Sequence, residues 1–505
     1  MTNGNSPHIV AIHILDDDSL LNIFYLYRPF FLGEGNEYER LYGGNEQWDE
    51  GRWWYRPAHV CQRWRNLILG SASYLRLSLL CTIGTPVQNM LAHSPSLPLT
   101  VDYSNEGDIT TEDEEGILFA LQRRDRVRHL RLYYPVQNLR KLVMAIDGEF
   151  PILEYLILET LTEDSMALVL PETLQTPHLR HLALNGFACP IRPRLHPVST
   201  SLVTLFLIID HPSAYFQPNI LLQWISFMPQ LEGLAIGFTF PVPNLDVERQ
   251  LTHTPSTTHA TLPNLRLFQF QGVTAYLEAV VSHFTTPRLE GLEIQFFKQL
   301  TFSFPRLAQF IHTTENIRFG DAVIMFEDEQ IRMGMSFREA DKYAFAVTVD
   351  SCHFDRQVSS VAQISNSLSQ VFSAVEYLTL RGRVHGQSSE ERNDVDRVEW
   401  RKLLRSFSNV KTLRVDDGLV EKLSRCLRLE DGELPLELLP ELQELTYIGS
   451  RDTGDAFSSF IDARQNAGHP VTLARHNSSS SSLSSESPAI TLPNDGAENG
   501  IGTSS

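Results

Sequence analysis

A short pattern of apolar and polar residues recurs along the chain from residue 127 onward. It spans six residues, with apolar side chains at the first, fourth and sixth positions, as in Leu153-Glu-Tyr-Leu156-Ile-Leu158. The ten copies begin at Val127, Leu153, Leu179, Leu202, Leu231, Leu265, Leu289, Val375, Val410 and Leu442. This spacing predicts a short strand whose apolar side chains stack on those of the next copy. The intervening side chains are expected to face solvent on a concave surface.

The segments between these copies predict helices, because their apolar residues recur at helical spacing. Examples are residues 139–146, 220–227, 276–284 and 400–407. Proline stands two residues before many copies, where it ends the preceding segment, at Pro151, Pro177, Pro229, Pro263, Pro287 and Pro440. Copies beginning at 127, 153 and 179 lie 26 residues apart, which is within the leucine-rich-repeat range. The sequence therefore predicts an α/β fold over residues 79–475, a curved leucine-rich-repeat-like solenoid with parallel strands.

The pattern weakens between Ile317 and Phe372. Only Phe345-Ala-Val-Thr-Val349 alternates like a strand there, so we expect one or two degenerate repeats. Two insertions, Pro241–Thr261 and Arg381–Arg397, are predicted to be surface loops. Residues 476–505 are rich in serine, and we expect a disordered tail.

Two amphipathic segments before the first repeat predict a small all-α domain over residues 8–78. The first runs from Ser19 to Tyr27, after three aspartates at 16–18 that suit the exposed amides of a helix start. A divalent-cation site at these aspartates is disfavoured, because adjacent side chains do not converge as calcium ligands do. The second segment is expected to run from near Pro57 to Gly70 as one helix.

Composition narrows the classes of function. The 61 acidic and 42 basic residues give a formal net charge of −19, which disfavours nucleic acid and anionic membranes as partners. The five cysteines include no CxxC pair, so neither a disulfide framework nor a zinc ribbon is indicated. With no secretory signal and no apolar run near the ~20 residues that cross a bilayer, we expect a cytoplasmic or nuclear protein.

Motifs that carry catalysis are missing from the sequence. It contains no GxSxG, GxxxxGK[ST] or HExxH pattern, so we expect no enzyme, no catalytic residue, no metal and no cofactor. An unrecognised hydrolase remains the least favoured alternative.

The N-terminal segments resemble the F-box. The resemblance rests on Ile14-Leu-Asp-Asp-Asp-Ser-Leu-Leu-Asn-Ile-Phe24 and on Ala58-His-Val-Cys-Gln-Arg-Trp-Arg-Asn-Leu67. It is similar to the F-box-like proteins with irregular leucine-rich repeats that are abundant in mushroom-forming fungi. Two differences are Asp16, where the family has proline, and the long insert from Pro29 to Arg52.

The resemblance implies a substrate-recognition subunit of a Skp-cullin-F-box ubiquitin ligase. In that family the F-box binds the Skp-type adaptor, and through it a cullin, while the repeats bind the protein to be ubiquitinated. Carried onto this chain, the adaptor contacts would be Leu15, Leu20, Ile23, Phe24, Val60, Cys61 and Trp64. The alternative is a repeat scaffold outside any ligase, in which the N-terminal helices only cap the solenoid.

Overall fold

The computed structural model describes most of the predicted repeat region and part of the N-terminal domain. The described residues are 15–27, 52–105, 107–161, 167–188, 200–240, 258–297, 299, 301–314, 316, 317, 319–336, 343–351, 353–382, 393–429, 434, 436–448 and 454–476. The predicted tail after His476, most of the Pro29–Arg52 insert and the greater part of both predicted loops lie outside them.

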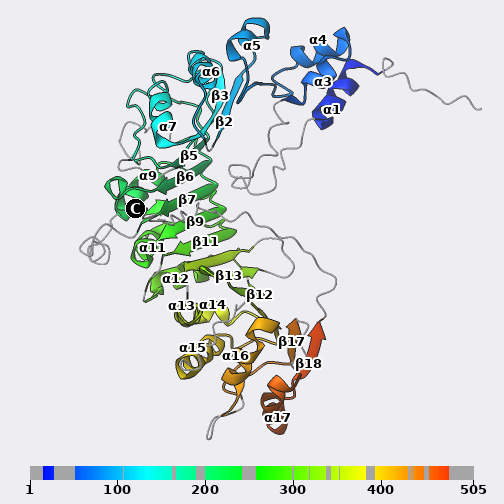
Figure 1. Cartoon of the computed structure of the whole chain (residues 1–505), viewed down its shortest axis with the longest axis vertical. Coiled ribbons are helices and arrows are strands. Elements are labelled where there is room, and N and C mark those ends of the chain that lie inside the picture. Colours follow the sequence, from blue (N-terminus) through cyan, green and yellow to red (C-terminus); the bar gives the residue numbers. More distant parts are fainter. Residues whose placement is uncertain are drawn as a thin grey trace, which may run out of the picture.

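One large sheet runs through the described chain, with its strands on the inner side of a curved array (Figure 1). Its 16 strands have the order β1-β2-β3-β4-β5-β6-β7-β9-β11-β14-β13-β12-β15-β16-β17-β18, and β8 and β10 form a separate pair. The strands are β1 (Leu79–Cys81), β2 (Leu99–Ser104), β3 (Val127–Tyr134), β4 (Tyr155–Thr160), β5 (His181–Asn185), β6 (Thr204–Ile209), β7 (Gly233–Phe238), β8 (Ala260–Thr261), β9 (Leu267–Gly272), β10 (Phe284–Thr285), β11 (Gly291–Phe296), β12 (Asp321–Phe326), β13 (Gln330–Ser336), β14 (Phe345–Asp350), β15 (Tyr377–Gly382), β16 (Thr412–Asp416), β17 (Glu444–Ile448) and β18 (Thr472–His476). Among the described strands, the pairings of β13 with β12 and with β14 are antiparallel, and all other pairings are parallel. The fold is therefore mixed α/β and is dominated by a mostly parallel sheet.

Helices that follow the strands cover the outer side of this sheet (Figure 1). They are α5 (Val87–His93), α6 (Thr111–Leu121), α7 (Val136–Val143), η4 (Pro212–Ala214), α9 (Pro218–Ile225), α11 (Thr274–Val281), α12 (Pro305–Thr313), α13 (Phe354–Ser367), α14 (Ser369–Phe372), α15 (Asn393–Arg405), α16 (Asp417–Leu427), η6 (Gly454–Phe457) and α17 (Ser458–Asn466). The four helices predicted between repeats are present as α7, α9, α11 and α15 with shifted ends. α15 begins at Asn393, inside the second predicted loop. Residues 393–397 of that predicted loop are therefore helical.

The ten repeat patterns all lie at strands, as predicted. Nine of the strands begin two residues after the pattern does, because the first apolar residue packs inside the turn that leads into the strand. At that turn, Arg266 N–H donates to Glu232 O at 2.8 Å, and Glu232 N–H donates to Val203 O at 2.7 Å. All thirty apolar positions of the pattern are buried, with exposed fractions of 5% or less. Backbone pairing and side-chain stacking therefore act at the same register in successive repeats.

The weak stretch after Ile317 does not contain degenerate repeats, and that prediction is wrong. It forms three antiparallel strands inserted in reversed order: β14 pairs with β11, and β12 pairs with β15. Only three residues connect β12 to β13, with Glu327 N–H donating to Gln330 O at 3.0 Å. A parallel neighbour would need a crossover of a dozen or more residues, so this short turn enforces a hairpin. The strand predicted at Phe345–Val349 is confirmed as β14.

The N-terminal domain contains α1 (Asp17–Tyr27), α3 (Tyr55–Ala58) and α4 (Gln62–Gly70). The second predicted helix is thus two helices, and the expectation of one continuous helix is wrong. Cys61 has an extended backbone (φ −158°, ψ 168°), and its Sγ accepts a hydrogen bond from Trp64 N–H. The cysteine therefore caps a new helix start within the predicted helix.

Candidate functional site

Two surfaces are candidates for function: the N-terminal helices and the inner strand face. The helices are held together first by a polar clamp. Arg63 of α4 donates through Nε and Nη2 to Asp17 Oδ1 at 3.0 and 2.6 Å, and through Nη2 to Leu15 O at 2.7 Å. Beneath the clamp, the rings of Phe24 and Trp64 meet edge to face with centroids 5.0 Å apart. α1 therefore has a defined position against α4.

The start of α1 has the predicted capping geometry. Asp16 Oδ1 accepts a hydrogen bond from Ser19 N–H at 2.7 Å. Hydrogen bonds from Ser19 lower the pKa of Asp16, which therefore accepts as a carboxylate. In the described chain, no group of three or more His, Cys, Asp and Glu side chains could hold a metal ion.

The residues predicted to contact an adaptor divide into two groups. Leu20 and Phe24 are buried, with exposed fractions of 0% and 2%, and Leu15 and Trp64 are half-buried against the same core. Ile23 and Val60 are 43% and 61% exposed, and Cys61 is exposed. Only this second group presents substantial surface to a partner.

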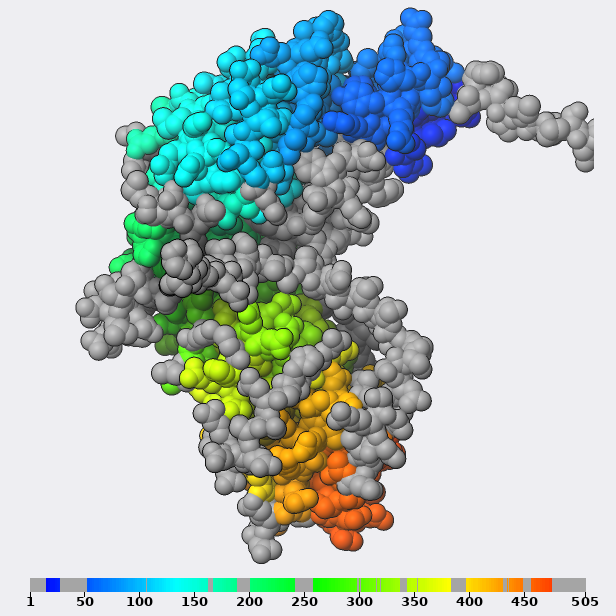
Figure 2. Space-filling view, viewed as in Figure 1, coloured from blue at the N-terminus to red at the C-terminus, as the bar shows by residue number. Residues whose placement is uncertain are grey.

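Further exposed apolar side chains, which the sequence prediction missed, lie on the same domain. Leu26 is 64% exposed, Tyr27 54%, Tyr74 52% and Tyr25 43%. The signal was present, because Ile23 and Leu26 are three residues apart on a side of α1 that adjoins the buried side with Leu20 and Phe24, whereas Tyr27 shares the side of Leu20 and Phe24. We call Ile23, Leu26 and Val60 the apolar N-terminal surface. The segment that holds α1, α3 and α4 forms the blue lobe beside the cyan first repeats in Figure 2.

The inner face of the sheet differs from the predicted polar surface over β4–β7. Its central row consists of Ile157, Ala183, Phe206 and Ala235, which oppose one another in register on successive strands. They form an apolar cluster separate from the main core, with exposed fractions of 7% or less and with Ile208 packed against it. The expectation that this face is polar holds at β9 and β11, where Gln269 Nε2 donates to Glu293 Oε2 at 2.6 Å, but is wrong over β4–β7.

Three charged side chains lie beside this apolar row on β2–β4. Asp102 opposes Arg131 in register, and Arg131 opposes Ile157, two residues before Glu159. Burial raises the pKa of Glu159 to about 7 and that of Asp102 to about 6, although Arg131 acts to lower both. Among the described residues, Asp102 Oδ1, Arg131 Nε and Glu159 Oε1 are buried with no hydrogen-bond partner. We call these three residues the acidic trio, because their charges sum to −1 when all are ionised.

Aromatic rings line the neighbouring row of the same face. His129, Tyr155 and His181 stack across β3, β4 and β5 with centroid separations of 4.3 and 4.0 Å. His181 Nδ1 lies 2.8 Å from Thr204 Oγ1 on β6. On the other side, Tyr133 opposes Glu159 in register. The acidic trio therefore lies between aromatic side chains, next to an apolar strip.

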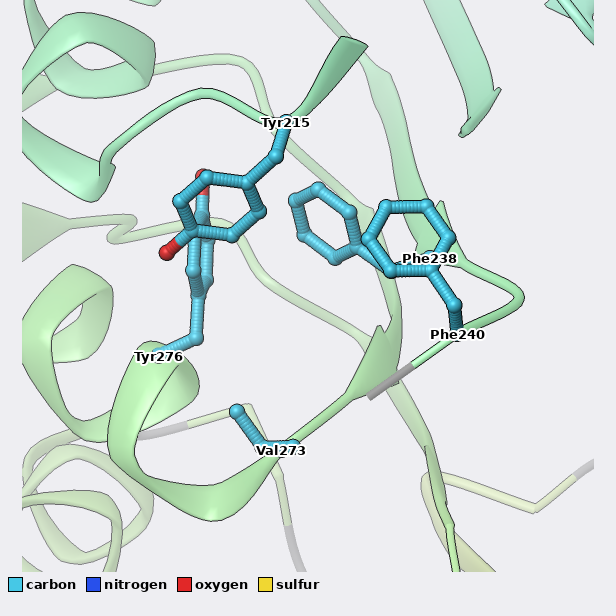
Figure 3. Close-up of a pocket in the computed structure, with 5 residues that line it drawn as sticks. All are labelled: Tyr215, Phe238, Phe240, Val273 and Tyr276. Atoms are coloured by element: carbon cyan, nitrogen blue, oxygen red, sulfur yellow. The ribbon is translucent and has the colours of Figure 1, made fainter. Parts of the chain in front are cut away.

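A small cavity at the end of β7 is lined by aromatic residues. It has a volume of about 10 Å³ and is lined by Val273 and by the rings of Tyr215, Phe238, Phe240 and Tyr276, which lie close together in Figure 3. Phe238 and Tyr276 meet edge to face with centroids 4.9 Å apart. Such a volume holds at most one water molecule, and the aromatic side chains around it pack against one another.

Comparisons with known proteins add little to this description. No family model matches the chain, and no curated protein matches it, so nothing in them supports an F-box. Among solved structures, the leucine-rich repeat-containing protein LegL7 from Legionella pneumophila is similar at 11% sequence identity, over 78% of this chain and 99% of that one, with a TM-score of 0.24. At this TM-score the likeness decides nothing, and the fold rests on the strands and helices themselves. No helix in the described residues is long and apolar enough to cross a membrane.

Proposed function

We propose that the protein is a substrate-recognition subunit of a Skp-cullin-F-box ubiquitin ligase. The N-terminal domain binds the Skp-type adaptor, and the inner strand face binds the target protein. The observation that carries the adaptor half is the apolar N-terminal surface: Ile23 and Leu26 of α1 are 43% and 64% exposed, and Val60, in the turn between α3 and α4, is 61% exposed, in segments that resemble the F-box. The exposure of three large aliphatic side chains on one small domain supports a protein-binding surface there.

The buried residues among the predicted adaptor contacts have a structural role in this proposal. Phe24 and Trp64 position α1 against α4, and the Arg63–Asp17 clamp fixes the same pair. Replacing Trp64 would therefore disturb folding and adaptor binding together. Exposed residues give a cleaner test.

The experiment is purification of the full chain with a Skp-type adaptor, followed by titration of the two proteins. We expect micromolar or tighter binding, lost in the double variant Leu26→Asp, Val60→Asp with the circular dichroism spectrum unchanged. Met144→Asp is the matched control, because Met144 is 73% exposed at the end of α7, far along the chain from these helices. Failure of the unaltered protein to bind any Skp-type adaptor would exclude the ligase function.

A scaffold outside any ligase is the second candidate, and one packing feature favours it. Trp54 Nε1 donates to Ser78 O at 3.1 Å, immediately before β1, and Trp54 shares one continuous core with Leu20 and Leu79. Repeat arrays need such a cap on their first repeat. Removal of residues 1–78 should then unfold or aggregate the array, while the unaltered chain binds no adaptor.

A further inference from the structure

We propose that the turn between α3 and α4 binds a protein segment in which carboxylates flank an apolar residue. We call Arg56, His59, Val60 and Arg65 the basic turn, and all four residues are exposed. The proposal rests on the proposed function only in taking this turn as part of a protein-binding surface. It names the chemistry of the partner there, which the ligase function leaves open.

The distribution of charge along the chain is the first reason. Residues 52–101 contain five arginines and no aspartate or glutamate, although the whole chain has a formal net charge of −19. Both α3 and α4 lie in this stretch. A local excess of positive charge attracts a partner of the opposite charge and speeds its association.

Two arginines of the basic turn have no counter-charge within the described chain. Arg63, their neighbour in α4, is paired with Asp17 at 2.6 Å. Among the described residues, no carboxylate forms an ion pair with Arg56 or Arg65. A carboxylate from a partner supplies the missing charge to an exposed guanidinium, and arginine binds carboxylates through paired N–H donors.

Hydrogen bonds already hold Arg65 in place. Its Nε donates to Ala58 O at 3.1 Å, and its Nη2 lies 3.2 Å from His59 Nδ1. A guanidinium has only donors, so His59 Nδ1 accepts and Nε2 carries the ring hydrogen. Arg65 Nη1 has no hydrogen-bond partner among the described residues. Because Arg65 is held before binding, it loses little conformational freedom when Nη1 donates to a carboxylate.

Val60 adds an apolar contact at the centre of the basic turn. It is 61% exposed, and its N–H donates to Pro57 O at 3.2 Å, which fixes the backbone of the turn. A partner that buries Val60 needs an apolar side chain between its carboxylates. A nucleic-acid backbone does not supply one, and the exposed carboxylates of Asp16 and Asp18 in the same domain repel phosphates.

The test uses the full-length protein and fluorescein-labelled peptides with a central leucine flanked on each side by two glutamates. Matched peptides carry glutamine or lysine in place of glutamate, or serine in place of leucine. Binding is measured by fluorescence polarisation. We expect the glutamate peptide to bind at least about tenfold more tightly than the glutamine peptide at low salt. The difference should shrink as salt is added, because exposed charges are screened.

Two charge variants locate the site of binding. Arg56→Gln with Arg65→Gln should remove the preference for the glutamate peptide, whereas Arg65→Lys, which keeps the charge, should retain most of it. Arg381→Gln with Arg414→Gln is the matched control. It removes the same charge from exposed positions on β15 and β16, and it should leave the preference unchanged.

A third variant separates recognition from damage to the fold. Val60→Ser should abolish the preference for leucine over serine at the centre of the peptide and keep the preference for glutamate over glutamine. A misfolded domain would lose both preferences together. Circular dichroism spectra that match the parent check the fold of every variant.

Four results would overturn the proposal. The glutamate peptide binds no more tightly than the glutamine peptide, the preference survives in the Arg56 and Arg65 double variant, the control variant loses it equally, or a short DNA duplex binds more tightly than the glutamate peptide. Because no adaptor is present in the assay, its failure leaves the ligase function testable, and failure to bind an adaptor leaves this result standing.

Discussion

The carboxylate of Glu278, in α11, accepts a hydrogen bond from the backbone N–H of Leu307, at the start of the next helix, at 2.8 Å. The other carboxylate oxygen accepts from Arg306 N–H at 2.9 Å. Phe304 occupies the N-cap position of α12 and has no side-chain acceptor, so the cap comes from the preceding repeat. One side chain thereby links two successive repeats.

Replacing Glu278 with alanine should lower the free energy of unfolding by about 1 to 2 kcal/mol, because two N–H groups lose their acceptor. The measurement is the denaturation midpoint of the full chain. Arg306→Ala is the control, since it keeps the backbone donor, and it should change the midpoint little. Equal effects of the two variants would contradict the cap.

Gly334 of β13 lies under the ring of Tyr343, and a Cβ there would come within 2.6 Å of two ring atoms. Gly334→Ala must displace the ring and should destabilise the protein by roughly 1 to 3 kcal/mol. Gly320→Ala is the matched control, because a Cβ at Gly320 meets nothing within 4 Å. If both variants unfold at the same denaturant concentration as the parent, the ring does not pack on this glycine.

The repeat pattern predicted the strands because buried positions recur with the same spacing in every copy. The burial of Leu292 and Leu413 could therefore be predicted from their own copies of the pattern, without knowing which strands lie beside them. The reversed insertion could not be predicted in this way. Strand order within it depends on the short turn after Phe326, whereas the alternation in Phe345–Val349 is the same for parallel and antiparallel strands. The Glu278 cap was equally hidden, since it joins residues 29 positions apart in the chain.

The candidate surfaces show the same limit. Helical spacing in α1 identified Leu20 and Phe24, but they are the buried face, and the exposed face with Leu26 has a similar apolar character. Glu159 occupies a strand position on the inner face, where the sequence predicts a solvated side chain, and the sequence contains no sign that its Oε1 is buried. Whether a charged side chain is buried depends on which side chains the strand register places next to it.

Protonation of the acidic trio should make stability depend on pH. Because burial raises the pKa of Glu159 to about 7 and that of Asp102 to about 6, the folded protein binds more protons than the unfolded chain between about pH 4 and 7. The free energy of unfolding should therefore fall as the pH rises through this window. For Glu159 the effect is on the order of 3 kcal/mol.

The double variant Asp102→Asn, Glu159→Gln isolates this effect. At pH 8 it should be more stable than the parent, and the difference should shrink towards pH 4.5, where the parent's carboxyls are protonated. Denaturant unfolding at four pH values between 4.5 and 8 measures both proteins. A stability difference that stays constant with pH would show that the carboxyls do not titrate in this range.

Arg464 of α17 is fully buried, and its Nη2 donates to Pro440 O and Leu442 O, each at 3.0 Å. Earlier repeats use asparagine for the bond to the corresponding proline: Asn264 Nδ2 donates to Pro229 O at 3.1 Å, and Asn316 Nδ2 donates to Pro287 O at 3.3 Å. The last helix therefore anchors the turn before β17 with a longer side chain. Arg464→Ala leaves both carbonyl groups without this donor, which should cost about 2 kcal/mol.

The loss should remain local, because each repeat contacts only its neighbours. Hydrogen exchange of Arg464→Ala should accelerate in β17 and β18 and stay unchanged in β3–β7, and Arg464→Lys should restore part of the protection by keeping a charged donor. Arg425→Ala is the control, since the Arg425 side chain is 54% exposed and forms an ion pair with Glu421 of the same helix. Acceleration spread evenly over the whole sheet would mean that the array unfolds as one cooperative unit, against the nearest-neighbour account of its stability.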